Sequence, residues 1–525
     1  MKAVLEELDP IWSRVLDGVG WNDAVMPKVR HAMSYVHPSA KRPGFGMGGG
    51  WDGTVSLLKF NRANDPLHPW FPTGCLHRVA EVLRQNGYEV EFCRARRPDC
   101  ILPIGCTIST LPGMFDFQRE AVQSWIDYGG YGFIHSVMGS GKTSYIAASA
   151  IKTMLDAGLT QEVLFLCERK EILVQARSVL QRQLGQPVGI LGGGVCDLQP
   201  VTVSTVQSLM SSWDQTQDYP AGRRPKVINR IGSVRMVVVD EGHHASAPIY
   251  QTLLKKMGNA QYRLGLSGTP EGNMGLQLLI ESVLGPVVYS RPYEFYINLN
   301  PPILATPTFW VYHMPTQRGI QLDEHDETSG ASKYAAYYRA YVTTNDVRND
   351  AIVRFCRNQA KRGKTVAVLV TRVEHGERLL EMMPEARWVY GSHGEEARWA
   401  AFDGLRDGEF SILISTLLTE AIDLPFLDSV VYACAGDSKV AFPQSWRCMR
   451  SNIKDGVATK PTCDIMTFVD RAKYLRDHSE RQLDMLNHRG FTIRHVGHIT
   501  PSFKKKMERE ATNGQQLLQD GALDC

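Results

Sequence analysis

One stretch of the sequence decides the fold: residues 133–143 read FIHSVMGSGKT. An apolar run of strand length leads into a glycine-rich turn, which is the order of a strand, a phosphate-cradling loop and a helix. In such a loop backbone N–H groups face the phosphates, a lysine reaches the β- and γ-phosphates, and a hydroxyl ligates Mg²⁺. The strict pattern has Gly six residues before the lysine, where this chain has Ser136. The residues that the motif assigns to phosphate and Mg²⁺ are Gly139, Ser140, Gly141, Lys142 and Thr143.

A second apolar run, residues 236–239, ends at Asp240-Glu241-Gly242-His243. Ligands of open α/β sheets bind beyond the carboxyl ends of the strands, so both carboxylates are expected near the nucleotide. Asp240 is predicted to hold Mg²⁺, and Glu241 to orient and deprotonate the attacking water. A glycine-rich turn or an Asp-Glu pair also occurs alone in ordinary α/β proteins. Together, in this order, the two motifs predict hydrolysis of a nucleoside triphosphate.

The composition is that of a multidomain globular protein, with 525 residues, 43% hydrophobic and 22% charged. The net charge of +3 gives no global argument for nucleic-acid binding, which must therefore rest on local patches. No apolar run reaches membrane-span length, and the first residues lack a signal-peptide core. We therefore expect no membrane partner and a cytoplasmic location. A loose group of four cysteines is interpreted as reduced thiols rather than a zinc site: Cys75, Cys93, Cys100 and Cys106.

Strand-length apolar runs alternate with helical patterns twice along the chain, which is typical of parallel sheets with helices on both faces. The pattern predicts an α/β fold with two tandem parallel-sheet domains, preceded by a small α+β domain. A segment with Pro301-Pro302 and a polar stretch is expected to lack regular structure. The predicted boundaries are 1–110 for the N-terminal domain, 111–295 for the first α/β domain, 296–345 for a linker, 346–503 for the second α/β domain and 504–525 for a polar tail.

The strands that this alternation predicts are set by apolar runs between turn signals. In the first α/β domain they are residues 132–137, 163–167, 201–204, 236–239 and 262–267. In the second they are residues 365–370, 387–390, 411–415, 429–433 and 464–468. In the N-terminal domain a strand is expected within 51–58, a helix at 76–85 and a strand at 90–92.

Four further strings lie at set positions around the two nucleotide motifs. Phe117-Gln118-Arg119 precedes the phosphate loop, and Ser267-Gly268-Thr269-Pro270 follows the strand after Asp240. In the second domain, residues 416–425 read TLLTEAIDLP and residues 443–450 read PQSWRCMR. In this order the strings resemble the motifs of the superfamily 2 DExH-box helicases and translocases. The resemblance implies two RecA-like domains, ATP and Mg²⁺ as cofactors, and hydrolysis coupled to movement along nucleic acid.

The resemblance assigns roles to side chains around the nucleotide. Gln118 is expected to read adenine, since an amide can donate to N7 and accept from the amino group; a solvent-facing Gln on a helix is the alternative. Ser267 and Thr269 are expected to bond the segment that carries His243 and so couple hydrolysis to domain closure. Asp423 is expected to face the ribose.

The last of these strings departs from the family pattern Gln-x-x-Gly-Arg-x-x-Arg. Trp446 replaces the glycine and Gln444 is displaced by one position, while the Arg-x-x-Arg pair is intact. Positions one helical turn apart lie on one face, and guanidinium geometry suits a phosphate. Arg447 and Arg450 are therefore expected to sense the γ-phosphate across the domain cleft. A surface helix with two arginines is the alternative.

Contacts to a nucleic-acid backbone are implied where the family's strand-end motifs fall. Hydroxyls, amides and arginines at strand ends suit contacts to phosphates that do not depend on base sequence. A helix cap or a solvated side chain is the alternative for each. The implied contact residues are Arg169, Thr205, Gln207, Thr371, Arg372 and Thr416.

Segments near both ends resemble one branch of this superfamily, the phage UvsW-type recombination helicases, with XPB-like relatives. The segments are residues 51–53, 71–74, 468–470 and 490–493, together with Arg481. This resemblance implies an ATP-dependent DNA helicase or translocase that remodels forks, Holliday junctions, D-loops or R-loops in DNA recombination, DNA repair or replication. Single-stranded and branched DNA are the implied partners, recombination or replication proteins are candidates, and a phage-encoded chain would act in the host cytoplasm.

Two alternatives share the same motor. An RNA helicase would use these motifs equally, because none of them reads a 2′-hydroxyl. A motor subunit of a restriction-type complex is the other alternative. A nuclease fused to the motor would need an additional metal site, and Pro98-Asp99 lacks the second half of such a motif.

Overall fold

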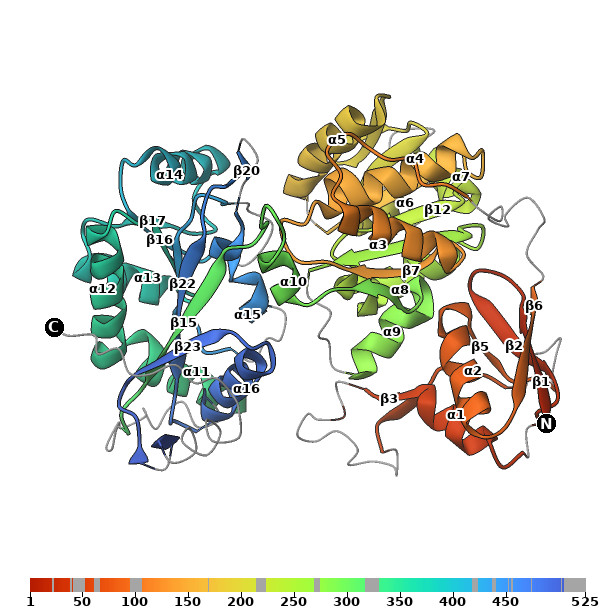
Figure 1. Cartoon of the computed structure of the whole chain (residues 1–525), viewed down its shortest axis with the longest axis horizontal. Helices are drawn as coiled ribbons and strands as arrows, with labels where there is room; N and C mark the ends of the chain where they lie inside the picture. The colour runs from red at the N-terminus through yellow and green to blue at the C-terminus, as the bar shows by residue number, and fades with distance from the viewer. Residues whose placement is uncertain are drawn as a thin grey trace. The chain divides into compact units, whose positions relative to one another are not determined.

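The computed structural model of this chain describes residues 1–20, 23–37, 40, 52–60, 67–94, 106–168, 170–213, 223–268, 274–316, 330–417, 424–436, 441–451, 453–454, 457–473, 475–501 and 503–504. The chain divides into two compact units, Met1–Arg291 and Pro292–Cys525. Figure 1 labels the helices and strands of each unit.

The first unit begins with a small α+β domain. Its described strands form a four-stranded sheet in the order β5-β2-β1-β6, in which β1 pairs antiparallel with β2 and parallel with β6. Every second residue of β1 is buried, so side chains such as Leu5 face the core. The elements are β1 Lys2–Glu7, β2 Trp12–Asp17, α1 Met26–Ala32, β3 Ser34–Val36, β4 Thr54–Ser56, β5 Trp70–Pro72, η2 Thr73–Cys75, α2 Leu76–Gln85 and β6 Glu89–Arg94.

The N-terminal domain packs on α9 (Met274–Leu284) of the domain that follows it. The Arg78 Nη2 donates to both carboxylate oxygens of the buried Glu281, at 2.9 and 2.7 Å. Leu278 of α9 belongs to the core of the N-terminal domain. A β-carbon on Gly74 would lie 1.8 Å from the Glu281 carbonyl oxygen, so only glycine fits there. The contact is close enough to fix the N-terminal domain on the first α/β domain.

We expect Gly74→Ala to destabilise the chain by about 1–3 kcal/mol, the usual cost of overpacking, because the opposing atom is backbone and moves with its helix. Differential scanning calorimetry measures the effect. Gly20→Ala is the matched control, since nothing lies within 4 Å of its β-carbon position. A transition of Gly74→Ala that coincides with that of Gly20→Ala would mean that this contact is not made.

The rest of the first unit is built on an eight-stranded sheet of described strands. Its order is β10-β9-β11-β8-β12-β13-β7-β14, with every neighbouring pair parallel except β10 and β9. The strands are β7 Tyr131–His135, β8 Val163–Cys167, β9 Val188–Gly192, β10 Val195–Asp197, β11 Val201–Thr205, β12 Met236–Val239, β13 Tyr262–Ser267 and β14 Val287–Ser290.

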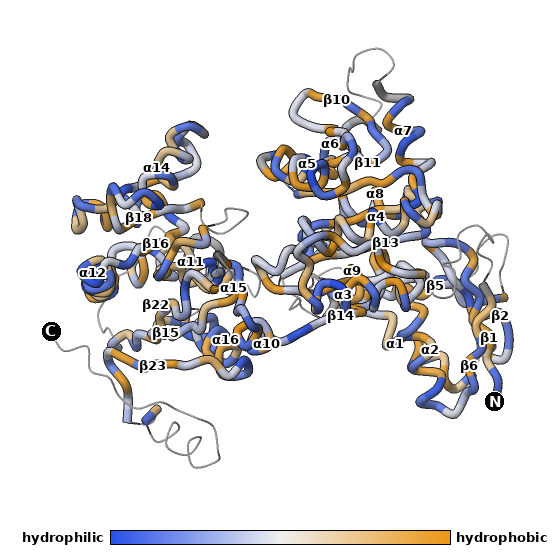
Figure 2. The backbone as a smooth tube through the Cα atoms, turned by 45° about the horizontal axis from the view of Figure 1, so that its top comes forward, coloured by the Kyte–Doolittle hydropathy of each residue, from blue (hydrophilic) through white to orange (hydrophobic). Residues whose placement is uncertain are grey.

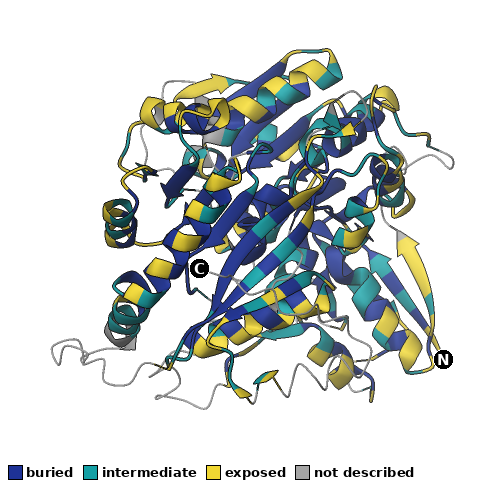
Figure 3. Ribbon diagram, turned by 60° about the vertical axis from the view of Figure 1, so that its left-hand side comes forward, coloured by how far each residue is buried: buried dark blue, intermediate teal, exposed yellow. Residues whose placement is uncertain are grey.

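Helices cover both faces of this sheet. In β12, Met236 and Val238 join one core cluster, and Val237 and Val239 join the other. This two-residue period is why the central strands are apolar throughout. Over the chain as a whole, Figure 3 shows strands that are mostly buried and helices with exposed turns, and Figure 2 colours the backbone by hydropathy. One face carries α3 Asp116–Asp127, α4 Ala148–Asp156 and α5 Lys170–Leu184; the other carries α6 Val206–Trp213, α7 Arg223–Ser233, α8 Pro248–Lys256 and α9.

The second unit contains a seven-stranded sheet, counted over its described residues, in the order β17-β18-β16-β19-β22-β15-β23. All of its neighbouring strands are parallel. The strands are β15 Thr306–His313, β16 Val366–Leu369, β17 Arg387–Val389, β18 Ile412–Ser415, β19 Ser429–Tyr432, β22 Thr462–Val469 and β23 Thr492–Gly497, beside the short hairpin β20 Ile453–Lys454 and β21 Val457–Ala458. The helical elements are α10 Tyr293–Ile297, α11 Gly330–Tyr338, η7 Arg339–Thr343, α12 Asp346–Lys361, α13 Val373–Met382, α14 Glu395–Asp407, α15 Ala441–Gln444, η8 Arg447–Met449 and α16 Leu475–His488.

The predicted fold class is confirmed: an α/β chain with two parallel-sheet domains after a small α+β domain. The expectation that residues 296–345 lack regular structure is wrong. They contain β15, which lies between β22 and β23, and α11. The alternating burial of β15 depends on strands about 150 residues later, which no local pattern reveals. Apart from Lys504, the polar tail expected at 504–525 lies outside the described residues.

Two expectations from composition concern the whole chain. Among the described residues, no helix is long and apolar enough to cross a membrane. The same residues contain no cluster of three metal-ligating side chains. Of the N-terminal cysteines, Cys75 is buried, Cys93 is exposed and Cys106 is intermediate, while Cys100 lies outside the described residues.

Candidate active site

The phosphate loop joins the buried strand β7 to a π-helical turn, η4 (Lys142–Ala147), which continues into α4. Gly139 and Gly141 have φ of 81° and 77°, a left-handed conformation that favours glycine. A β-carbon on Gly141 would also lie 2.7 Å from the Gln118 amide nitrogen. Ser136, at the position where glycine was expected, is buried and donates its backbone N–H to the Ser267 carbonyl at 3.0 Å. The loop therefore forms despite this departure from the strict pattern.

Side chains inside the loop are arranged to receive phosphate. The Lys142 ammonium donates to the carbonyls of Ser136 and Val137, at 3.1 and 3.2 Å, which holds it within the loop. The Ser140 hydroxyl is buried and has no hydrogen-bond partner among the described residues. A buried, unpaired hydroxyl is costly unless a ligand completes it. The lysine, this hydroxyl and the backbone of the turn fit a triphosphate.

The two carboxylates follow β12, as predicted. The Thr143 hydroxyl donates to the Asp240 Oδ2 at 3.5 Å, so both groups assigned to Mg²⁺ lie together. Hydroxyl and carboxylate oxygens are the ligands that this hard cation prefers. Burial and the neighbouring charge of Glu241 raise the pKa of Asp240. A bound divalent cation would offset that cost by favouring the ionised carboxylate.

Glu241 has the geometry of a group held for a reaction. Its φ of 45° is the one left-handed value among the described non-glycine residues. Such backbone strain clusters at functional sites. Burial opposes ionisation, yet His243 and Lys142 outweigh it and lower the pKa of Glu241. Its Oε2 has no hydrogen-bond partner among the described residues, which leaves an ionised oxygen for a water molecule.

Next to the carboxylates, His243 links the hydrolytic segment to β13. Its Nδ1 lies 2.9 Å from the Ser267 hydroxyl, a hydrogen bond that the family resemblance predicted. The same nitrogen is 3.3 Å from the Glu241 Oε2, but the shorter contact to Ser267 defines its hydrogen bond. His244 pairs with Glu168 at 3.0 Å, a contact that the sequence analysis missed. Thr269, the second residue of the coupling motif, lies outside the described residues.

Gln118 is not the solvent-facing residue that the alternative describes. It is 2% exposed, and its amide nitrogen donates to the Ser140 carbonyl at 2.7 Å. Its amide oxygen accepts from the Phe115 N–H at 2.9 Å, which caps α3. The side chain thus ties the start of α3 to the phosphate loop. The adenine contact remains a prediction.

The arginine pair does not lie on one α-helical face as predicted. The helix α15 ends at Gln444, Arg447 begins the short 3₁₀ turn η8, and Arg450 is extended with ψ of 129°. Arg447 is buried and Arg450 half-buried, so the surface-helix alternative is also wrong. Trp446, which lies between the end of α15 and η8, is itself buried. Four aromatic rings surround the Trp446 ring, with centroids 5.2–5.8 Å from its own.

The neighbours of the Trp446 ring come from α10, β15, α15 and the residues after α16. Ring centroids are separated by 5.2 Å for Phe309, 5.2 Å for Phe442, 5.5 Å for Phe491 and 5.8 Å for Tyr293. The Arg489 guanidinium lies 4.9 Å from the Trp446 ring centroid. An aromatic cluster of this kind stabilises the loop that carries the arginines. Trp446 therefore has a structural reason to replace glycine.

The predicted nucleic-acid contacts fall into several classes. Thr205 is buried and its hydroxyl accepts from the Ser208 N–H at 3.1 Å, so it caps α6, while Gln207 is exposed. The Thr371 hydroxyl bonds the Tyr338 hydroxyl at 2.5 Å, and the exposed Arg372 lies over the Tyr338 ring at 5.5 Å. Thr416 follows β18 and is half-buried. Arg169 and Asp423 lie outside the described residues.

Comparison with known proteins gives several matches. Residues 112–272 match the family model described as "Type III restriction enzyme, res subunit". The protein named "Putative helicase 22" of Sulfolobus islandicus filamentous virus is 23% identical over 344 residues, covering 63% of this chain and 60% of that protein. DNA 3'-5' translocase XPB2 of Sulfurisphaera tokodaii is 28% identical over 179 residues, covering 34% of this chain and 36% of that protein. The matches thus span less than two thirds of the length of these two relatives.

Among solved structures, the crystal structure of bacteriophage T4 UvsW covers 95% of this chain and 99% of that chain, with 15% identity and a TM-score of 0.44.

Proposed function

We propose that this chain, which resembles the superfamily 2 helicases as its motifs predicted, is an ATP-hydrolysing DNA helicase or translocase that remodels branched DNA. The observation that carries the proposal is the chain of contacts from the phosphate loop through Asp240 and Glu241 to His243 and Ser267. It joins a hydrolytic site to a strand of the motor domain. Forks, Holliday junctions, D-loops and R-loops are the proposed substrates, in recombination, repair or replication.

For hydrolysis, each group has a separate task. Lys142 and the loop backbone would bind the β- and γ-phosphates, and Thr143 with Asp240 would hold Mg²⁺, which supplies charge neutralisation when bound. Glu241 would accept a proton from water as the water oxygen attacks the γ-phosphorus and the bond to the bridging β–γ oxygen breaks. ADP and phosphate then leave. Arg447 and Arg450 are proposed to stabilise the charge on the transferring group.

For coupling, the Ser267–His243 hydrogen bond could transmit a change at the nucleotide to the end of β13. His243 lies beside Glu241, and Ser267 ends β13. A change in charge at the γ-phosphate would alter the position of His243 and thus this bond. Such a two-state contact is what converts hydrolysis into domain movement.

For branch recognition, we propose a groove between the N-terminal domain and the first α/β domain. It has a volume of about 300 Å³ and is lined in part by Arg84, Phe92, Tyr128 and His77. Phe92 and Tyr128 are 46% and 43% exposed, which is unusual for aromatic side chains. The Arg84 guanidinium lies 5.5 Å from the Phe92 ring centroid. Exposed rings beside a cation suit an unpaired base at a junction.

The groove proposal predicts a selective loss. Phe92→Ala combined with Tyr128→Ala should lower the rate of fork and four-way-junction unwinding about tenfold or more, the effect expected from lost base stacking. Hydrolysis stimulated by long single strands should fall far less. Phe92→Tyr combined with Tyr128→Phe keeps both rings and is the matched control. Equal losses of the two activities in the alanine variant would assign the rings to general strand binding instead.

The choice between DNA and RNA is tested by one panel of ATPase measurements. Single-stranded DNA, forked DNA and RNA of equal length are compared at one salt concentration, since phosphate binding depends on salt. Stimulation by forked DNA above the other two supports the proposal. Stimulation by RNA alone would favour an RNA helicase. The match of residues 112–272 to a restriction-enzyme subunit also keeps a motor within a larger complex as the second candidate.

A further inference from the structure

Four tyrosines lie along one helical segment of the second unit, α11 with η7. Their spacing of three, four and seven residues places them on one side of a helix. Tyr334 and Tyr338 contact the domain: the Tyr334 hydroxyl donates to the Ala435 carbonyl at 3.5 Å, and Tyr338 bonds Thr371. The rings of Tyr337 and Tyr341 instead stack on each other, with centroids 5.8 Å apart and planes at 12°. Both of these rings are only half-buried.

The stacked pair lines a pocket at the carboxyl ends of two strands. Its volume is about 200 Å³, and its lining includes Thr316 after β15 and Asp470, Arg471 and Lys473 after β22. Ligands of parallel α/β sheets bind at this edge. None of these residues belongs to the motifs that point to ATP or to the family's strand contacts.

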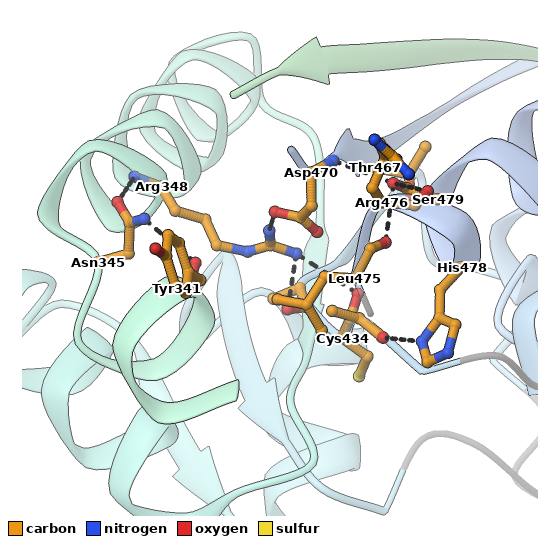
Figure 4. A network of polar contacts seen from close by, with 12 residues as sticks. Tyr341, Asn345, Arg348, Cys434, Thr467, Asp470, Leu475, Arg476, His478 and Ser479 are labelled. Atoms are coloured by element: carbon orange, nitrogen blue, oxygen red, sulfur yellow. Dashed lines mark hydrogen bonds and ion pairs between the residues drawn. The ribbon is translucent and has the colours of Figure 1, made fainter. Parts of the chain in front are cut away.

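Asp470, the acidic residue of this lining, forms a buried ion pair with Arg348. The Arg348 Nη1 donates to the Asp470 Oδ1 at 2.7 Å, and both side chains are buried. Arg348 also donates to the carbonyls of Ala433 and Cys434, and its guanidinium lies 3.9 Å from the Phe468 ring centroid. Figure 4 shows Arg348 reaching from α12 toward Asp470, with Tyr341 beside it. The opposite charges of Arg348 and Asp470 therefore offset each other at the base of the pocket.

Two cationic side chains, Arg471 and Lys473, belong to the same lining. Arg471 is held in place because its guanidinium donates to the Thr316 hydroxyl at 3.4 Å and to the His498 carbonyl. Lys473 is exposed, and its ammonium carries three donors. The lining thus combines two cationic side chains with two aromatic rings. This is the combination that binds a nucleotide unit of a single strand.

We propose that this pocket is an additional single-strand subsite, in which Tyr337 and Tyr341 stack on one base and Lys473 with Arg471 contacts an adjacent phosphate. Its volume is below the 300–1,000 Å³ or so of typical ligand pockets, which suits one nucleotide rather than a folded element. The Tyr338–Thr371 bond connects the tyrosine segment to a residue already implied in strand contact. The inference deepens the proposed function, because it requires that the motor binds a single strand.

The test measures the affinity of the full-length chain for a fluorescent single-stranded DNA by anisotropy without ATP. Tyr337→Ala and Tyr341→Ala should each weaken binding about five- to a hundredfold, the range for loss of one stacked base. Tyr337→Phe and Tyr341→Phe should bind as the wild type does, because the rings remain. Lys473→Gln should lower the slope of log affinity against log salt by about 0.7, one phosphate contact. Thermal unfolding of each variant checks that the fold is retained.

Trp399→Ala is the matched control, since Trp399 is 51% exposed on α14 of the same unit, and its affinity should be unchanged. A strand carrying 5-iodouracil should crosslink to peptides containing Tyr337 or Tyr341, and free mononucleotide should not displace it. Wild-type affinity in both alanine variants would overturn this subsite alone. Displacement by free mononucleotide would overturn its assignment to a strand. A wild-type chain that binds no single strand would overturn the proposed function as well.

Discussion

Replacing Glu241 with Gln is expected to leave ATP binding in place and to lower the turnover rate by about a hundredfold or more, the usual contribution of a positioned general base. The amide keeps the shape of the side chain, but it cannot accept the proton from water. The measurements are phosphate release under saturating ATP and equilibrium binding of a fluorescent ATP analogue.

Glu168→Gln is the matched control for Glu241→Gln. Glu168 lies near the same site but pairs with His244, so its loss should affect turnover much less. Near-normal turnover of Glu241→Gln would remove Glu241 from the role of base. An equal loss in both variants would indicate a general electrostatic effect of the acidic groups rather than proton transfer.

Removing either arginine of the divergent motif is expected to have a still larger effect on stimulated hydrolysis. Arginine fingers contribute about a thousandfold or more in rate. Arg450→Ala and Arg447→Ala should therefore abolish nucleic-acid-stimulated hydrolysis while ATP still binds. Steady-state phosphate release with and without single-stranded DNA measures the loss.

Because Arg447 is buried, its alanine variant could also disturb folding. Lysine variants at both positions address this, since lysine keeps the charge but lacks the planar fork that binds phosphate in two places. They should fold and still fail to be stimulated. Arg476→Ala is the control, because this arginine is exposed and pairs locally with Asp477. Wild-type stimulated rates in both single alanine variants would show that the motif is aligned wrongly across Trp446.

Sequence predicted best those elements whose signal is local and continuous. The bounds of β8, β12 and β13 match the predicted strands, because buried parallel strands are apolar throughout. The helix α2 also matches its predicted bounds, Leu76–Gln85. The phosphate loop and the two carboxylates could be predicted because their motifs combine glycine at special backbone angles with fixed chemical groups.

Prediction from the sequence failed for the elements and side chains whose structure depends on residues far away in the chain. The strand β15 begins after Pro301-Pro302 and a short loop, and its pairing with β22 and β23 spans more than 150 residues. The burial of Gln118 follows from its bond to Ser140, and the course of the Arg447–Arg450 segment follows from the packing of Trp446. None of these contacts has a local signature. The roles of Gln118, Asp423, the arginine pair and the strand-contact residues remain predictions.

The central claim is that ATP hydrolysis by this chain remodels branched DNA. The most direct measurement is conversion of a labelled four-way junction by the full-length chain with Mg²⁺ and ATP, resolved on a native gel beside the Glu241→Gln variant. We predict that the wild type converts the junction only when ATP is hydrolysed, and that Glu241→Gln binds it without converting it. The claim would be contradicted by an intact junction under conditions in which single-stranded DNA stimulates wild-type hydrolysis.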